Sequence, residues 1–160
     1  MTAPTTVVVH RDQQSLADAA AARLVVALVD AQSARGVAHV SLTGGSMGSH
    51  IVTSLTQVPA REGVDWSRVH VWWGDERYLP AGDPDRNDTQ NGAAGLDTLG
   101  LEPSHVHRVP GPDASPSAEA SAEAYAAALR EHGRSSLFDV MVLGVGPDGH
   151  VASLFPHHPA

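Results

Sequence analysis

Short β-branched runs alternate with longer segments of helical periodicity along this chain, and this alternation restricts the fold more than any other feature. The helical pattern is clearest over residues 15–35, where apolar residues recur every three or four positions and Gly36 follows the last turn. Strands that alternate with helices favour a parallel sheet covered by helices on both faces. We predict strands at 5–10, 37–42, 69–73, 106–109 and 138–143, and helices at 15–35, 46–56, 91–99 and 117–132, with another opening at 151–155.

The predicted fold is an α/β domain with an open, mainly parallel sheet wound on both faces. A length of 160 residues suits one domain. The sequence stops shortly after a glycine loop at 144–149, and no closing strand or helix follows. We therefore expect residues 1–160 to form a single α/β domain that lacks its C-terminal part.

The composition excludes several classes of chemistry and of partner. The chain has neither Cys nor Lys, which removes thiol nucleophiles, disulfides, Schiff-base lysines and P-loop lysines. The net charge of −8, with scattered acidic residues, argues against a nucleic-acid or anionic-membrane surface. No apolar run is long enough to span a bilayer, and no signal-peptide pattern is present. We expect a cytoplasmic protein.

Three polar or glycine-rich clusters each follow a predicted strand directly, at residues 44–46, 74–77 and 144–150. In open parallel sheets, ligands bind outside the carboxyl ends of the strands. The three clusters therefore predict a ligand site at that edge of the sheet.

The first cluster is Gly44-Gly45-Ser46, with Ser46 as the predicted N-cap of the following helix. Glycines allow close approach of a ligand, and a helix N-terminus favours an anion such as phosphate. A tight turn with a serine cap is the alternative. Gly44-x-Ser46-x-Gly48 also matches a nucleophile elbow. A Ser46 hydrolase stays an alternative, although few strands precede Ser46 and no oxyanion segment is recognisable.

The second cluster contains Asp75 and Arg77. Arg77 can bind a phosphate with two parallel hydrogen bonds, and Asp75 can orient a histidine or bind a sugar hydroxyl. A surface ion pair is the alternative. The polar loop at 78–90 follows, and its Asp83-x-Asp85-x-Asn87 spacing fails as a calcium loop because the required Gly and Glu are absent. We interpret it as a polar lid or a substrate loop.

The third cluster ends in His150, at the exit of the glycine loop. A neutral imidazole there can act as a general base near pH 7. The loop matches G-x-G-x-x-G, but a dinucleotide site needs an acidic residue about 20 positions further on, beyond Ala160. The other histidines are interpreted as packing or surface residues, so we expect no metal site.

The longest matches to a known family lie at residues 71–77, 84–87 and 138–156. There the chain resembles the 6-phosphogluconolactonase family, whose members hydrolyse 6-phosphoglucono-δ-lactone in the oxidative branch of the pentose phosphate pathway. The resemblance implies a Rossmann-like, doubly wound sheet, no metal and no cofactor. It implies a small phosphorylated sugar lactone as the partner, with no nucleic acid and no membrane. It leaves the oligomeric state open.

The resemblance also implies roles for individual residues. His150 would activate water, and Asp75 would orient or polarise a neighbouring group in the site. The phosphate would be held by Gly44, Gly45, Ser46 and Arg77. We add Asn87 and Gly146 to the substrate-binding set, with the N–H groups near Gly146 as candidates for the oxyanion hole. The family usually has Thr-Pro after the Gly-Gly-Ser, where this chain has Met47 and Gly48, and its members continue well past residue 160.

Two further alternatives stay open. Glucosamine-6-phosphate deaminases of the same superfamily carry a glutamate that pairs with the histidine, in a Phe-Asn-Glu-Pro stretch. Residues 153–156 offer no carboxylate, which favours the lactonase. A non-catalytic sugar-phosphate-binding domain would keep the glycine pair and Arg77 but would not need His150.

Overall fold

The computed structural model of the chain describes residues 5–132 and 138–159 and contains a three-stranded parallel sheet in the order β2-β1-β3. The strands are β1 (Ala38–Leu42), β2 (Val69–Trp73) and β3 (Val140–Met141). The central strand β1 pairs along its whole length with β2, from Ala38 opposite Val69 to Leu42 opposite Trp73, but pairs with only two residues of β3. Because all three strands are parallel, their carboxyl ends meet at one edge of the sheet.

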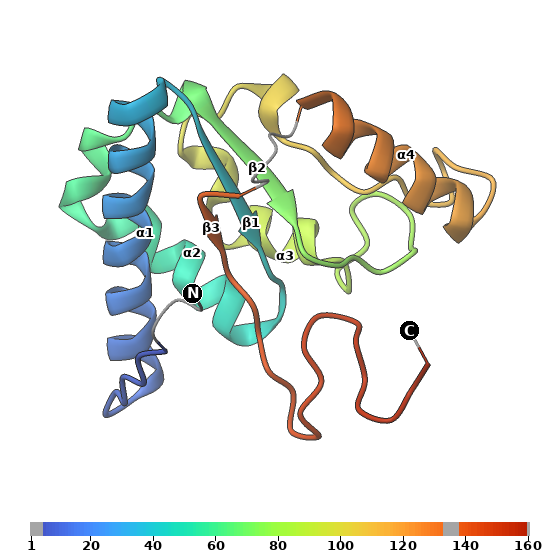
Figure 1. Cartoon of the computed structure of the whole chain (residues 1–160), viewed down its shortest axis with the longest axis horizontal. Coiled ribbons are helices and arrows are strands. Elements are labelled where there is room, and N and C mark those ends of the chain that lie inside the picture. The colour runs from blue at the N-terminus through green and yellow to red at the C-terminus, as the bar shows by residue number, and fades with distance from the viewer. Residues whose placement is uncertain (1–4, 133–137, 160) are drawn as a thin grey trace.

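Helices cover both faces of this sheet, which confirms the predicted α/β fold. The long helices are α1 (Gln13–Arg35), α2 (Gly45–Gln57) and α4 (Ala118–His132), and α3 (Asn87–Ala93) is short. Figure 1 shows α1 on one side of the strands and α4 on the other. Short 3₁₀ turns lie at Pro59–Gly63, Trp66–Arg68, Leu96–Thr98 and Pro103–His105.

Successive side chains of β1 and β2 point to opposite faces of the sheet, so each face packs against a different layer of the protein. One face of the strands joins the main hydrophobic core with α1 and α2, which contribute Leu24, Leu28, Ile51, Val52 and Leu55. The opposite face carries Trp72, which packs edge to face against Tyr125 of α4 with ring centroids 5.9 Å apart. The Tyr125 hydroxyl also accepts a hydrogen bond from the Trp73 N–H at 2.9 Å.

Histidines fill the rest of the face beneath α4, as packing residues. His39, His70, His105 and His107 form the histidine stack, in which neighbouring rings lie nearly parallel at centroid distances of 3.9 to 5.2 Å. Trp72 stacks on His107 at 3.7 Å. Burial lowers the pKa of His70 to about 3 and that of His107 to about 4, assisted by the neighbouring imidazoles. His70 and His107 are therefore neutral at physiological pH.

Capping interactions fix both ends of helix α1. The Asp12 carboxylate accepts the Ser15 N–H at 2.7 Å, a standard N-terminal cap. Gly36 ends the helix in the left-handed region, with φ of 76°, and its N–H donates to the Gln32 carbonyl. The predicted helix at 15–35 and its glycine stop are confirmed.

Several predicted elements are wrong or shorter than expected. Residues 5–10 form no strand, and Val7 and Val9 are 83% and 89% exposed. Residues 106–109 provide one isolated bridge, and the strand predicted at 138–143 pairs only at Val140–Met141. Residues 151–155 form turns and isolated bridges in place of a helix. A β-branched run supplies strand propensity, but a strand also needs a neighbouring backbone to pair with.

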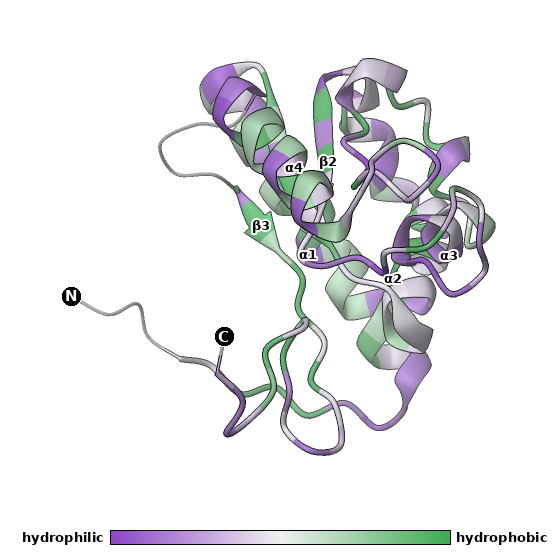
Figure 2. Ribbon diagram, turned by 90° about the vertical axis from the view of Figure 1, so that its right-hand side faces the viewer, coloured by the Kyte–Doolittle hydropathy of each residue, from purple (hydrophilic) through white to green (hydrophobic). Residues whose placement is uncertain are grey.

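The chain thus divides into a layered body, residues 13–132, and a C-terminal segment, residues 138–159. Figure 2 shows the part of this segment after β3 looping below the layered body, with hydrophobic stretches along it. Within the described residues, no helix is long and apolar enough to cross a bilayer.

Candidate active site

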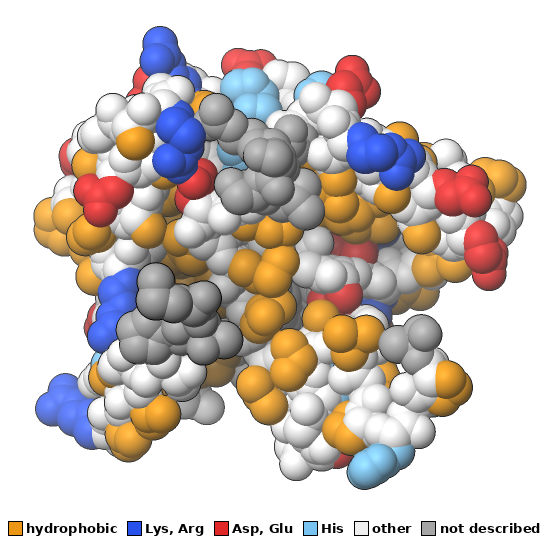
Figure 3. All heavy atoms as spheres, viewed as in Figure 1, with side chains coloured by type: hydrophobic (Ala, Val, Ile, Leu, Met, Phe, Trp, Pro, Cys, Tyr) orange, Lys and Arg blue, Asp and Glu red, His pale blue; other side chains and the backbone are white. Residues whose placement is uncertain are grey.

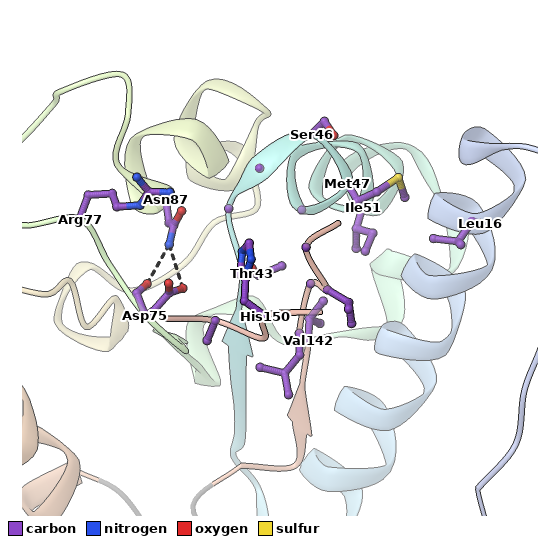
Figure 4. A pocket seen from close by; sticks show the side chains of 18 residues that line it. Leu16, Thr43, Ser46, Met47, Ile51, Asp75, Arg77, Asn87, Val142 and His150 are labelled. Atoms are coloured by element: carbon purple, nitrogen blue, oxygen red, sulfur yellow. Dashed lines mark hydrogen bonds between the residues drawn. The ribbon is translucent and has the colours of Figure 1, made fainter. Parts of the chain in front are cut away.

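All eight residues predicted for the site line a single cavity of about 450 Å³. The cavity lies at the carboxyl ends of the strands, where the three sequence clusters meet (Figure 4). Leu16, Met47, Ile51 and Val142 provide apolar parts of its wall. The eight predicted residues are Gly44, Gly45, Ser46, Asp75, Arg77, Asn87, Gly146 and His150.

The backbone and its surroundings explain why both residues after β1 and Thr43 are glycines. A Cβ on Gly44 would lie 1.9 Å from Asn87 Oδ1, so a side chain there collides with α3. Gly45 has a φ of 74°, a conformation that L side chains rarely adopt. Gly44 is the N-cap of α2 and makes no side-chain cap hydrogen bond, so the prediction of Ser46 as the cap is wrong. Ser46 lies exposed in the first helical turn, where N–H groups have no intrahelical acceptor.

Helix α3 joins the loops that follow β1 and β2. Asn87 Nδ2 donates to the Asp75 carbonyl at 2.8 Å and to the Asp75 carboxylate at 3.2 Å. The buried Asn91 accepts from Trp73 Nε1 at 2.9 Å and donates to the Thr43 carbonyl at 3.2 Å. Gln90 Oε1 accepts the Gly45 N–H at 2.8 Å. Gln90 and Asn91 were not among the predicted site residues, although their helical spacing from Asn87 places the three on one face.

A buried ion cluster fixes the start of α3. The Glu76 carboxylate accepts the N–H groups of Asn87 and Asp88 at 2.7 and 3.0 Å. The Arg86 guanidinium, only 2% exposed, donates to Asp88 at 2.9 Å and lies 3.9 Å from Glu76. Burial raises the pKa of Glu76; burial also acts to raise the pKa of Asp88, but the hydrogen bond and charge of Arg86 outweigh it and lower that pKa. Glu76, Arg86 and Asp88 together thus hold Asn87 in place.

Arg77, by contrast, points its charge at the cavity. Its side chain is exposed and lines the cavity wall, and within the described part of the chain no carboxylate forms an ion pair with it. Its backbone N–H donates to Glu76 at 2.8 Å, which fixes the residue without using the guanidinium. The surface ion pair considered for Arg77 is absent from the described residues, and the guanidinium remains available to an anion.

His150 is paired with Asp148 inside the glycine loop. The imidazole Nδ1 lies 2.5 Å from Asp148 Oδ1, and this hydrogen bond lowers the pKa of Asp148. Since a carboxylate accepts, Nδ1 carries the proton and Nε2 is left as the acceptor. A Cβ on Gly146 would lie 2.0 Å from the His150 ring, so glycine is required there. Asp148 was not among the predicted site residues, although its spacing of two residues from His150 is a recognisable signal.

Two predicted roles need correction. Asp75 Oδ2 accepts the Ser153 hydroxyl at 2.6 Å, and Asp148 is the carboxylate beside the histidine, so Asp75 does not orient His150. The Gly146 N–H donates to the His150 carbonyl at 2.8 Å and is not a free oxyanion donor. Asp75 instead connects the layered body with the C-terminal segment.

The arrangement combines an anion-binding side with a basic side. A guanidinium and the N-terminus of α2 line one part of the cavity, and both favour a phosphate or carboxylate. An imidazole with a free nitrogen lines another part. No three His, Asp or Glu side chains of the described ranges come together as metal ligands.

Comparisons with known proteins identify the family. A family model described as glucosamine-6-phosphate isomerases/6-phosphogluconolactonase matches residues 11–160. The 6-phosphogluconolactonases of Streptomyces coelicolor and Mycobacterium leprae are 51% and 39% identical, over 95% and 93% of this chain. A solved 6-phosphogluconolactonase structure from Trypanosoma brucei has a TM-score of 0.75 at 28% identity, covering 97% of this chain and 65% of its own.

The chain spans 61% and 62% of the lengths of the two curated relatives. The similarity nevertheless includes all three clusters that line the cavity, from residue 44 to residue 150. The chain belongs to the family of glucosamine-6-phosphate isomerases and 6-phosphogluconolactonases.

Proposed function

We propose that this chain carries the active site of a 6-phosphogluconolactonase, which hydrolyses 6-phosphoglucono-δ-lactone to 6-phosphogluconate. The observation that carries the proposal is the meeting of His150 and Arg77 in one cavity beside the N-terminus of α2. A phosphorylated lactone presents a phosphate at one end and an electrophilic carbonyl at the other. The cavity offers one group suited to each end. A charged sugar phosphate stays in the compartment where it is made, so the proposal includes a cytoplasmic location.

The reaction needs little beyond placement and a base. His150 Nε2 takes a proton from water, whose oxygen forms a bond to the lactone carbonyl carbon and produces a tetrahedral oxyanion. The oxyanion collapses, the bond from that carbon to the ring oxygen breaks, and the ring oxygen leaves as a hydroxyl with the proton from His150. Asp148 holds the imidazole in the required tautomer and stabilises its charged form. Positioning of the phosphate by Arg77, Gly44, Gly45 and Ser46 supplies orientation.

The deaminase reading is less well supported. His150 already has a carboxylate partner, Asp148, from within its own loop. Residues 151–156 contain no acidic side chain that could act as the second carboxylate of a ring-opening deaminase. The curated relatives at 51% and 39% identity are both named as lactonases.

The Ser46 hydrolase reading also lacks support. Ser46 lies in the first turn of α2, and only β1 precedes it in the sheet of the described residues. The hydrogen bonds of the described residues include none between Ser46 and a histidine. An activated serine needs such a base within reach. We therefore expect a fluorophosphonate probe to leave Ser46 unlabelled, and Ser46→Ala to raise KM with little effect on kcat.

The test is the rate of lactone hydrolysis, corrected for spontaneous ring opening. The proposal predicts catalysis of 6-phosphoglucono-δ-lactone opening that Ser46→Ala retains at saturating substrate. Stoichiometric labelling of Ser46, blocked by substrate, would replace this mechanism with the serine one. Phosphate binding with no acceleration above the spontaneous rate would support the non-catalytic binding domain.

A further inference from the structure

The first N–H of α2 is already occupied by a side chain from another helix. Gly45, the first residue of α2, donates its N–H to Gln90 Oε1 at 2.8 Å. Gln90 belongs to α3 and lies on the same helix as Asn87, which touches Asp75. A neutral amide oxygen therefore occupies a position at the helix N-terminus that favours anionic oxygens.

The orientation of the Gln90 side chain is fixed at its other end. Gln90 Nε2 donates to the Pro84 carbonyl at 3.1 Å, so the amide nitrogen faces Pro84 and the oxygen faces Gly45. Both contacts lie at the protein surface, and Gly45 itself is exposed. A ligand in the cavity can therefore reach the Gly45 N–H once the side chain moves.

We propose that Gln90 is a specificity-determining residue that holds the Gly45 N–H in place of a phosphate oxygen and is displaced when the phosphate binds. The inference rests on the proposed function, because it assigns the phosphate to the cavity. The exchange is favourable because a hydrogen bond to an ionised phosphate is roughly twice as strong as one to a neutral amide. Arg77, which lines the same cavity, adds attraction for the anion but not for a neutral ligand.

This role depends on the side chain being neutral. A carboxylate at position 90 would be ionised at neutral pH, would accept the Gly45 N–H more strongly and would repel a phosphate. A side chain of similar length with no strong acceptor would leave the N–H free. Charge at this one position therefore sets which ligands the helix N-terminus accepts.

The test compares Gln90→Glu, Gln90→Met and the wild type by titration with inorganic phosphate, followed through the Gly45 amide resonance. We expect phosphate to shift this resonance in the wild type. Gln90→Glu should weaken phosphate binding by about 10- to 100-fold, as expected for losing a charge-assisted contact. Gln90→Met should bind at least as tightly as the wild type. Gln57→Glu, which adds the same charge at the far end of α2, is the control and should change the affinity by less than about 2-fold.

The kinetic readout separates this role from a purely structural one. Gln90→Glu should raise KM for the phosphorylated lactone and leave kcat and the turnover of unphosphorylated gluconolactone nearly unchanged. Equal weakening by Gln90→Met and Gln90→Glu would overturn the inference and show that Gln90 only shapes the loop. A silent Gly45 resonance beside retained lactonase activity would overturn it alone, whereas loss of phosphate binding and activity in the wild type would also remove the proposed function.

Discussion

The layered body and the C-terminal segment line the same cavity but are packed very differently. In the body, β1 and β2 are paired along five residues and their core-facing side chains are almost fully buried. In the C-terminal segment, five large apolar side chains are 46% to 73% exposed, namely Met141, Leu143, Val145, Leu154 and Phe155. Figure 3 shows hydrophobic side chains exposed along the middle of the molecule, in the region of β3 and the segment after it.

Few hydrogen bonds attach the segment to the body beyond the short pairing of β3 with β1. Asp139 accepts from the His39 N–H at 2.8 Å and pairs with Arg35, and the Val142 N–H donates to the Ser41 carbonyl. Beyond Val142, the bond from Ser153 to Asp75 is the one hydrogen bond to the body among the described residues. The residues proposed to bind the phosphate thus belong to the body, and His150, the proposed base, belongs to the segment.

The largest effect should come from the base itself. His150→Gln keeps a polar side chain of similar size but removes the proton acceptor, so kcat should fall by about 10²- to 10⁴-fold. Phosphate affinity should stay within about 2-fold, because the residues proposed to bind the phosphate lie in the body. His157→Gln, in the same segment and exposed, is the control. Near-normal turnover by His150→Gln would mean that another group activates the water.

A smaller effect is expected from the partner of that base. Asp148→Asn keeps an acceptor for the Nδ1 proton but removes the charge that stabilises the imidazolium formed during the reaction. Hydrogen bonds between charged groups imply a loss of about 10- to 100-fold in kcat. Rapid-mixing or steady-state kinetics measures it, and an unchanged KM is part of the expectation. If Asp75→Asn lowers kcat far more than Asp148→Asn does, the assignment of Asp148 is wrong.

The attachment of the segment can be weakened directly. Ser153→Ala removes the hydrogen bond to Asp75 and should lower kcat by about 2- to 10-fold, the range of a single neutral hydrogen bond. Ser153→Thr, which keeps the hydroxyl, should restore most of the activity. A full loss in both variants would show that the segment is held by packing at Ser153 and not by this bond.

Two histidines of the body make its stability sensitive to acid. The pKa values of His70 and His107 are about 3 and about 4 in the fold, against an ordinary value of 6.5. As the pH falls, these two histidines are therefore protonated in the unfolded chain before they are protonated in the fold. Their contribution to the free energy of unfolding is fully present above about pH 6.5 and decreases as the pH falls towards 4. Urea unfolding followed by tryptophan fluorescence should show a lower midpoint at about pH 5 than at about pH 7.

A substitution within the histidine stack tests that explanation. His107→Phe keeps a ring against Trp72 but cannot be protonated, so its unfolding midpoint should depend less on pH than that of the wild type. His50→Gln, at an exposed site on α2, should leave the pH dependence unchanged. The same pH dependence in His107→Phe as in the wild type would exclude the stack as its source.

The sequence predicted the body better than the segment for a physical reason. Residues 37–42 and 69–73 are apolar enough to be buried on one face whatever their neighbours, and both formed strands. Residues 5–10 and 138–143 have a similar composition, but strand formation depends on a partner that composition does not reveal. Residues 5–10 have none among the described residues, and 138–143 have one for two residues only.

For the site, the sequence predicted which residues meet but not all of the hydrogen bonds that they make. The three clusters came from their place after strands, and their seven predicted residues meet in the cavity with Asn87 of the polar loop. What could not be read from the sequence was which groups are already paired. Gln90 on the Gly45 N–H is such a pairing, because it joins two helices and depends on three-dimensional placement, whereas the two-residue spacing of Asp148 and His150 was a usable signal.

The central claim, that the body selects the phosphate and the segment supplies the base, is tested most directly by one ratio. This is kcat/KM for 6-phosphoglucono-δ-lactone divided by kcat/KM for unphosphorylated gluconolactone, measured for the wild type, Arg77→Ala and His150→Gln. The account predicts that Arg77→Ala lowers the ratio by about 10- to 150-fold, the value of a charge-assisted bidentate contact. It predicts that His150→Gln lowers both rate constants and leaves the ratio within about 2-fold of the wild type. A ratio unchanged in Arg77→Ala, or one that falls as far in His150→Gln, would contradict it.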